Sequence, residues 1–396
     1  MQLRPHQTEA LQSMADNDLG QVIVPTGGGK TMCMIHDVIR EITDRDYEQT
    51  IVVVAPRILL AEQLCREFIE ILDINFSTSI SYMHVHSGKV DGMYNTTKPF
   101  EIQEFVESCT GHKMMFTTYH SLHRIQESGV DVDTIYFDEA HNSVQKNFFP
   151  ATEYFSNNAH RCYFFTATPK HSRTTEKAGM NHTRTYGNVI CQVPAPTLVR
   201  AGHILPPKVE VYKSRILKKD ELVADRDCEQ MIGAIDNIRK DKVLICAKST
   251  KQIVSLISRT DFVSELAYRG YSWMMITSKT GAMIDGEKVT REEFFDTLNK
   301  WGRDYSKRFV VLHHSILSEG INVNGLEAVL FMRNMDYIGI SQTIGRVIRK
   351  GAEDKVFGLV CVPVYSNVGI STARKVEAVV DTIFNQGKAA TTVVTR

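Results

Sequence analysis

The sequence has no excess of charge of either sign, no closely paired cysteines and no long apolar run. It carries 46 basic and 46 acidic side chains, so a nucleic-acid site must be a local patch or use backbone amides. Its eight cysteines are scattered without a C-x-x-C pair, which is typical of reduced thiols in an intracellular protein. With neither an 18-residue apolar stretch nor a signal-peptide pattern, the chain is predicted to be soluble, cytoplasmic and free of membrane contact.

The length of 396 residues favours two domains, and strands alternate with helices throughout. Apolar runs such as Ile51–Ala55 and Thr134–Phe137 are typical of strands buried on both faces of a parallel sheet. The paired prolines in Leu205-Pro206-Pro207 suggest a junction, after which a second strand–helix series begins. We therefore predict an α/β protein with domains 1–205 and 206–396, each a parallel sheet flanked by helices, and a mobile loop over Lys279–Val289.

A glycine-rich loop lies between a predicted strand and a predicted helix, in Val22-Ile23-Val24-Pro25-Thr26-Gly27-Gly28-Gly29-Lys30-Thr31. Backbone amides of such a loop and the following helix N-terminus bind phosphate oxygens, while Lys30 adds a full positive charge. The Thr31 hydroxyl is then placed to reach a nucleotide-bound Mg²⁺. A merely flexible turn explains neither the lysine and threonine after the glycines nor the strand before them.

Upstream of this loop, Leu3–Leu11 is predicted to be a helix that begins near Pro5. It carries Arg4 and Gln7. The amide of Gln7 can both donate to and accept from an adenine edge. The alternative is a surface glutamine on an amphipathic helix, and the neighbouring phosphate loop favours the adenine role.

Two adjacent carboxylates, Asp138 and Glu139, follow the buried strand Thr134–Phe137 within the sequence Asp-Glu-Ala-His. Their position predicts that they lie at the carboxyl edge of the sheet, where doubly wound folds bind ligands. Asp138 would bind Mg²⁺ and Glu139 would polarise an attacking water. The alternative is an ordinary helix start, where acidic residues are favoured.

In the C-terminal half, Gln342, Arg346 and Arg349 are spaced to share one face of a helix. Two guanidinium groups and an amide are suited to stabilise charge on a transferring phosphoryl group. The alternative is a solvated basic face.

His84 and His86 could be proposed as metal ligands, but they have no acidic or cysteine neighbour in sequence. Ordinary strand histidines are the better interpretation.

The motifs occur in a fixed order: Arg-Pro-His-Gln, Pro-Thr-Gly-Gly-Gly-Lys-Thr, Ala-Pro-Arg, Thr-Thr-Tyr-His-Ser, Asp-Glu-Ala-His, Thr-Ala-Thr, Ser-Glu-Gly-Ile-Asn and Gln-Thr-Ile-Gly-Arg-Val-Ile-Arg. This order resembles that of superfamily 2 helicases. The chain is similar to DEAH-type members of the branch shared with restriction-enzyme helicase subunits, and its last motifs are most similar to phage recombination helicases of the UvsW type.

The resemblance implies two tandem RecA-like P-loop domains that form an ATP-binding cleft, with ATP and Mg²⁺ as cofactors and nucleic acid as partner. It assigns adenine binding to Arg4 and Gln7, phosphate binding to Thr26–Thr31, and metal binding to Thr31 and Asp138. The catalytic residues that it implies are Lys30, Glu139, Gln342, Arg346 and Arg349. His141, Thr166 and Thr168 would couple the ATP site to the bound strand. Nucleic-acid contacts would come from Arg57, Thr117, Thr118, Lys248, Ser249, Ser318, Glu319 and Gly320.

Two departures from the family pattern matter. Asn322 stands where many relatives carry an acid, and fewer than 25 residues precede the phosphate loop, which leaves out the N-terminal module of UvsW-type proteins. No nuclease motif is evident. The resulting prediction is a monomeric, nucleic-acid-stimulated ATPase acting on DNA in the cytoplasm, the host's if a phage encodes it. A DExH RNA helicase, and an ATP-switched clamp that remodels partners without unwinding, remain the alternatives.

Overall fold

The computed structural model describes residues 3–75, 80–90, 92–174, 176–214, 217–314, 325–332, 344, 358–365, 369–381, 384 and 392–394. The chain divides into two compact units, the first formed by Met1–Pro194 with Thr391–Arg396 and the second by Ala195–Ala390. Residues 195–205 therefore group with the second unit, and the boundary at Leu205 stays a prediction. Among the described residues, no helix combines the length and apolarity needed to cross a bilayer.

The first unit is an eight-stranded sheet in the order β4-β3-β5-β2-β6-β7-β1-β9, and every neighbouring pair is parallel. Its elements are α1 Pro5–Ala15, β1 Leu19–Ile23, α2 Lys30–Asp44, β2 Thr50–Ala55, α3 Ile58–Asn75, β3 Ile80–Val85, β4 Tyr94–Asn95, α4 Pro99–Ser108, β5 His112–Thr118, α5 Leu122–Ser128, β6 Thr134–Phe137, the 3₁₀ helix η1 Ala140–Asn142, α6 Phe149–Asn158, β7 Arg161–Thr166, β8 Lys170–Ser172, α7 Thr183–Tyr186, β9 Asn188–Gln192 and β18 Thr392–Val394. A short strand pair, β8 with β18, lies outside the large sheet.

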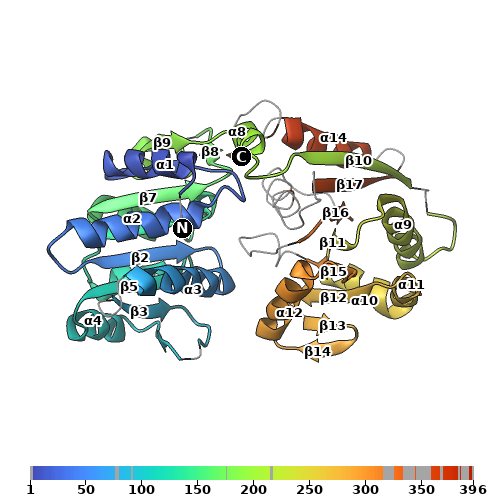
Figure 1. The fold of residues 1–396 in the computed structure, drawn as a ribbon, viewed down its shortest axis with the longest axis horizontal. Helices are drawn as coiled ribbons and strands as arrows, with labels where there is room; N and C mark the ends of the chain where they lie inside the picture. Colours follow the sequence, from blue (N-terminus) through green and yellow to red (C-terminus); the bar gives the residue numbers. More distant parts are fainter. Residues whose placement is uncertain are drawn as a thin grey trace. The chain divides into compact units, whose positions relative to one another are not determined.

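Helices cover both faces of this sheet, and its central strands β2, β6 and β7 are buried along their whole length. In β6, Ile135 and Phe137 join the apolar cluster under α5 and α6, while Tyr136 between them lies outside that cluster. Successive strand residues point to opposite faces, so Tyr136 faces the layer formed by α1, α2 and α3, which overlies the sheet in Figure 1. The carboxyl ends of the parallel strands meet at one edge, where the glycine-rich loop and the two carboxylates follow β1 and β6.

The second unit has its own eight-stranded sheet, ordered β10-β17-β16-β11-β15-β12-β13-β14. Its elements are α8 Ala195–Arg200, β10 Pro207–Ser214, α9 Val223–Ile238, β11 Lys242–Cys246, α10 Thr250–Arg259, α11 Phe262–Tyr268, β12 Ser272–Thr277, β13 Gly281–Ile284, β14 Glu287–Val289, α12 Arg291–Arg303, β15 Phe309–His313, β16 Ala328–Phe331, β17 Gly358–Tyr365 and α14 Gly369–Val380. The six strands from β10 to β12 in this order pair in parallel, as the alternating sequence predicts.

The segment Lys279–Val289, predicted to be a mobile loop, is instead the antiparallel hairpin β13–β14 at the sheet edge. Its two-residue turn is Asp285-Gly286, with φ of 45° and 97°. Positive φ at both turn positions is the geometry of a type I′ turn, which matches the twist of the paired strands and favours Asp-Gly. The prediction was wrong because it took the glycine of this dipeptide as a sign of flexibility and not Asp-Gly as the signal for a hairpin turn.

The two histidines near the end of β3 are buried side chains. His86 Nε2 lies 3.2 Å from His84 Nδ1, and each residue is 1% exposed. The pKa of each imidazole is lowered to about 4, mainly by burial, and at His84 also by the charges of His86 and Arg66. No group of three or more histidine, cysteine or acidic side chains in the described part of the chain could hold a metal ion.

This pair predicts acid-sensitive stability. Between about pH 4 and 6.5 the unfolded chain binds protons at these histidines and the folded chain does not, so stability falls as the pH is lowered through this range. The loss should reach about 2 kcal/mol per histidine near pH 5. Urea unfolding at about pH 7.5 and pH 5 should show a smaller loss for His84→Gln/His86→Gln than for wild type. The exposed His160→Gln is the control, and equal losses in all three proteins would contradict the prediction.

Candidate functional site

The glycine-rich loop leaves β1 in a tight turn and leads directly into α2. Val24 N–H donates to Thr166 O of β7 at 3.1 Å, and Gly28 N–H donates to Pro25 O at 2.9 Å. Gly27 and Gly29 both have φ of 84°. A Cβ at Gly29 would lie 2.4 Å from Gln7 Nε2, the end of a flexible side chain that could move away, so it is the left-handed φ that favours glycine at this position.

Three side chains from the start of α1 bond to the loop's carbonyls: Arg4 Nη1 to Gly27 O at 3.4 Å, His6 Nε2 to Gly28 O at 2.7 Å, and Gln7 Nε2 to Gly29 O at 3.2 Å. Gln7 Oε1 also accepts from Arg4 N–H at 2.8 Å. α1 therefore holds the loop by its carbonyl side. The first N–H groups of α2 have no intrahelical acceptor and can bind an anion. The adenine role of Arg4 and Gln7 stays a prediction.

His6 is a site residue that the sequence analysis did not single out. It is 7% exposed, and burial lowers the pKa of its imidazole, which favours the neutral form. A neutral imidazole can donate from Nε2 to Gly28 O. Its position between Arg4 and Gln7 was the available signal, because all three lie on the one segment that contacts the loop.

The two predicted carboxylates lie at the carboxyl end of β6. Asp138 N–H donates to Val54 O at 2.8 Å, which fixes its backbone in the sheet edge. Glu139 has φ of 47° and ψ of 50°, a left-handed conformation that is uncommon for a residue with a side chain. Glu139 Oε1 lies 3.9 Å from Lys30 Nζ. The glycine-rich loop and the Asp-Glu pair therefore meet, as predicted from the sequence.

This site has the charge and ligand types that suit Mg²⁺. Burial, and then the charge of Glu139, raise the pKa of Asp138 to about 7, whereas Lys30 opposes this shift. Lys30 thus offsets only part of the unfavourable effect of burial and of Glu139 on the ionised Asp138, and a bound divalent cation would favour the ionised form. Mg²⁺ prefers oxygen ligands and commonly binds one or two carboxylates together with nucleotide phosphates. The Asp138 carboxylate and the Thr31 hydroxyl fit this chemistry.

The residues predicted to couple the site to a bound strand lie in contact with one another. His141 Nδ1 is 3.0 Å from Thr166 Oγ1 and 3.6 Å from Glu139 Oε2. Thr166 Oγ1 also accepts from Thr168 N–H at 3.1 Å. A change at Glu139 can therefore reach the end of β7 through His141, although the coupling role itself stays a prediction.

The predicted nucleic-acid contacts have structural partners of their own. Thr117 is fully buried and donates to Val85 O at 2.8 Å, and Thr118 is 3% exposed. Arg57 directly precedes α3, and its carbonyl accepts from Leu60 N–H. In the second unit Lys248 is exposed, and Ser249 caps α10 by accepting from Gln252 N–H at 3.2 Å.

The remaining predicted residues lie outside the described part of the chain. These are Gln342, Arg346, Arg349, Ser318, Glu319, Gly320 and Asn322. Their roles stay predictions from sequence.

Part of the chain matches a known protein family. A family model described as "Type III restriction enzyme, res subunit" matches residues 1–171, which include the loop, both carboxylates and Thr166 to Thr168. No curated protein sequence matches the chain.

Three solved structures are similar over nearly the whole chain. The ATP-dependent Type ISP restriction-modification enzyme LlaBIII bound to DNA has a TM-score of 0.75 and 20% identity, covering 100% of this chain and 31% of its own. A nuclease-deletion mutant of the Type ISP restriction-modification enzyme LlaGI, in complex with a DNA substrate mimic, has a TM-score of 0.68 and 21% identity. The match covers 99% of this chain and 30% of that protein. Mss116p bound to ssRNA and AMP-PNP has a TM-score of 0.66 and 14% identity. The match covers 100% of this chain and 75% of that protein.

These likenesses establish the fold: an α/β protein of two tandem RecA-like domains, each with a mostly parallel sheet flanked by helices. The chain spans about a third of the length of the two restriction enzymes.

Proposed function

We propose that the chain is an ATP-dependent helicase or translocase that acts on DNA and hydrolyses ATP to ADP and phosphate with Mg²⁺. The observation that carries this proposal is the meeting of Lys30 and Glu139 at 3.9 Å, beside a glycine-rich loop whose carbonyls are bonded to the start of α1. A lysine that binds the phosphates and a carboxylate that orients the attacking water are two protein groups suited to phosphoryl transfer to water.

In this proposal each part of the site has a separate role. Loop amides and Lys30 bind the β- and γ-phosphates, and Thr31 with Asp138 would hold Mg²⁺, which neutralises charge on the phosphates when bound. Glu139 orients the attacking water and accepts its proton. His141, which contacts both Glu139 and Thr166, transmits the change toward the end of β7. Gln342, Arg346 and Arg349 are proposed to complete the site, with Arg349 as the arginine finger.

DNA is proposed as the substrate because two of the similar structures contain DNA or a DNA mimic. A DExH RNA helicase is the alternative, since Mss116p is bound to ssRNA and the present chain spans more of that protein. We also propose that the chain is a DEAH-type helicase, because it carries Asp-Glu-Ala-His at residues 138–141. The proposed likeness to the UvsW type is based on the motifs from Ser318 to Arg346. We also propose that the protein acts as a monomer in the cytoplasm.

A strand-displacement experiment tests whether turnover drives movement. The full chain would be given ATP and forked DNA, branched DNA, a DNA triplex or an RNA duplex. The proposal predicts ATP-dependent displacement on at least one DNA substrate, greater than on RNA. Greater displacement on RNA would favour the RNA helicase. Nucleic-acid-stimulated hydrolysis without displacement on any substrate would favour an ATP-switched clamp.

Nucleic-acid binding should be strongly salt-dependent although the formal net charge is zero. Phosphate contacts release counterions, so affinity should fall by roughly 10³-fold or more between 50 and 200 mM salt if about six phosphates are bound. Fluorescence anisotropy with labelled oligonucleotides of unrelated sequence would measure this. A flat salt response, or a strong preference for one base sequence, would contradict contact through the phosphate backbone.

A further inference from the structure

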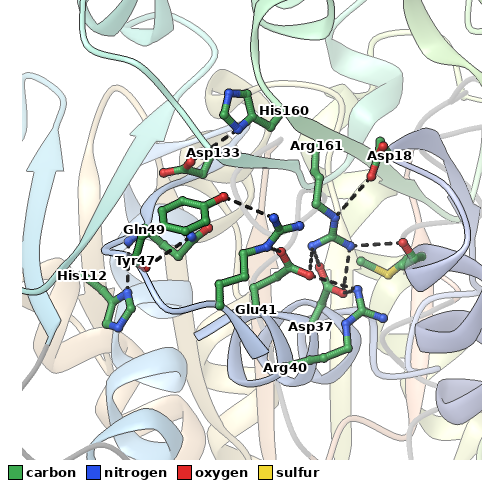
Figure 2. Close-up of polar contacts among 12 residues, drawn as sticks. Asp18, Asp37, Arg40, Glu41, Tyr47, Gln49, His112, Asp133, His160 and Arg161 are labelled. Carbon is green, nitrogen blue, oxygen red and sulfur yellow. Dashed lines mark hydrogen bonds and ion pairs between the residues drawn. The ribbon is translucent and has the colours of Figure 1, made fainter. Parts of the chain in front are cut away.

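A buried polar network lies beneath the proposed ATP site, between α2 and the strands β6 and β7. At its centre, Arg161 of β7 forms a fork with Asp37 of α2: Nη1 lies 3.1 Å from Oδ2, and Nη2 lies 3.2 Å from Oδ1. Arg161 is 3% exposed and Asp37 is fully buried. Figure 2 shows the guanidinium reaching from its strand to Asp37 and to Glu41 on the helix.

The charges of this network balance. Arg161 Nη1 also pairs with Glu41 Oε1 at 2.7 Å, and Arg40 Nη2 pairs with Asp37 Oδ1 at 2.5 Å (Figure 2). Arg45 Nε pairs with Glu41 Oε2 at 2.5 Å, and Arg161 Nε lies 3.9 Å from Asp18 Oδ1. Three carboxylates thus face three guanidinium groups. A buried charge left without its partner is strongly unfavourable, so the network holds its members in one arrangement.

The same network reaches the two other elements that build the site. The hydroxyl of Tyr136, on β6, donates to Asp37 Oδ2 at 2.6 Å. Arg161 Nη2 donates to Met14 O of α1 at 3.1 Å, and Tyr163 OH donates to the same carbonyl at 2.7 Å. One cluster therefore joins α1, α2, β6 and β7.

Each of these four elements carries part of the proposed ATP site at its other end. α2 begins at Lys30, and Asp37 lies seven residues further on, roughly 10 Å along the helix. Tyr136 precedes Asp138 by two residues, or roughly 7 Å of strand. β7 runs from Arg161 to Thr166, and α1 starts with the side chains that hold the glycine-rich loop. A slide of α2 along the sheet would change the distance between Lys30 and Glu139.

We propose that Asp37, Arg161 and Tyr136 are positioning residues for ATP hydrolysis: by fixing α2 against β6 and β7, they hold Lys30 and Thr31 in register with Asp138 and Glu139. This inference rests on the proposed ATPase function and adds residues that touch neither nucleotide nor water. Since α1 is bonded to the same network, the carbonyls of the glycine-rich loop are also fixed relative to α2, β6 and β7.

Tyr136→Phe and Asp37→Asn test this proposal. Tyr136→Phe removes one hydroxyl and leaves Asp37 paired with Arg161, whereas Asp37→Asn also removes the charge of the fork. A misplacement of about 1 Å can lower turnover by up to 10²-fold, so we expect kcat to fall between about 10-fold and 10²-fold in Asp37→Asn. Tyr136→Phe should show a smaller fall in the same direction. ADP affinity should change much less, because ADP binding does not need Glu139 in register.

The matched control is Tyr271→Phe in the second unit. Its hydroxyl donates to Lys240 O at 2.7 Å and contacts Arg308 Nη2 at 3.0 Å, so the chemical change is the same, in the other unit. Thermal unfolding of every variant sets an assay temperature at which all are folded. Amide hydrogen exchange over residues 31–37 should increase in Tyr136→Phe and not in Tyr271→Phe.

The outcomes separate the inference from the proposed function. A wild-type chain that binds no ATP would overturn the proposed function itself. A wild-type chain that hydrolyses ATP, with kcat unchanged in a folded Tyr136→Phe and Asp37→Asn, would show that the network is structural only. If Asp37→Asn does not fold, Tyr136→Phe alone decides, and an unchanged kcat there overturns the inference.

Discussion

Glu139→Gln should bind ATP normally and lose hydrolysis by about 10²–10⁴-fold, the contribution typical of a general base. The amide keeps the size of the side chain but cannot accept the proton of the attacking water. Removing the Glu139 charge also removes a cause of the raised pKa of Asp138, so Asp138 should be more fully ionised at neutral pH. Binding of Mg²⁺ and ATP should therefore not weaken, and the ATP- and nucleic-acid-bound state should accumulate.

The control for this variant is Glu127→Gln, which removes a carboxylate from an exposed ion pair with Arg124 on α5. Single-turnover hydrolysis and ATP affinity, measured separately, distinguish lost chemistry from lost binding. Hydrolysis by Glu139→Gln at a rate near that of wild type would remove Glu139 from the proposed mechanism.

Arg349→Ala should nearly abolish hydrolysis, with a loss of about 10³–10⁵-fold, because an arginine finger contacts the phosphoryl group most strongly in the transition state. Lys30 and Glu139 belong to the first unit, whereas Arg349 follows the predicted junction at Pro206-Pro207. The proposed role of Arg349 rests on its sequence motif. ATP affinity should then change much less than turnover, since the glycine-rich loop of the first unit binds most of the nucleotide.

Arg303→Ala, at an exposed position in the last turn of α12, is the control for loss of a positive charge. Phosphate release and ATP affinity would be measured with saturating nucleic acid. An Arg349→Ala protein with the turnover of Arg303→Ala would show that the first domain hydrolyses ATP without this residue.

The sequence predicted the fold well where one physical signal dominated. Continuous apolar runs identified the parallel strands, because a strand covered by helices on both faces has no polar side. The β13–β14 hairpin was missed since its signal is the Asp285-Gly286 turn rather than an apolar period. β9, in a stretch where turn residues accumulate, was also missed, and it completes the sheet by pairing with β1.

The site was predictable where its parts are contiguous in sequence. The glycine-rich loop and the Asp-Glu pair are local patterns, and their meeting follows from the parallel sheet. The fork between Asp37 and Arg161 joins residues 124 positions apart, so no local pattern could indicate it. His6 shows the same limit at shorter range, because its bond to Gly28 depends on how α1 packs against the loop.

The central claim is tested most directly by measuring phosphate release from ATP by the full chain, with Lys30→Ala as the inactive reference. The account predicts Mg²⁺-dependent release that single-stranded or duplex DNA accelerates, and no such release by Lys30→Ala. Release that Lys30→Ala matches, or no ATP binding and no release by wild type under any of these conditions, would contradict it.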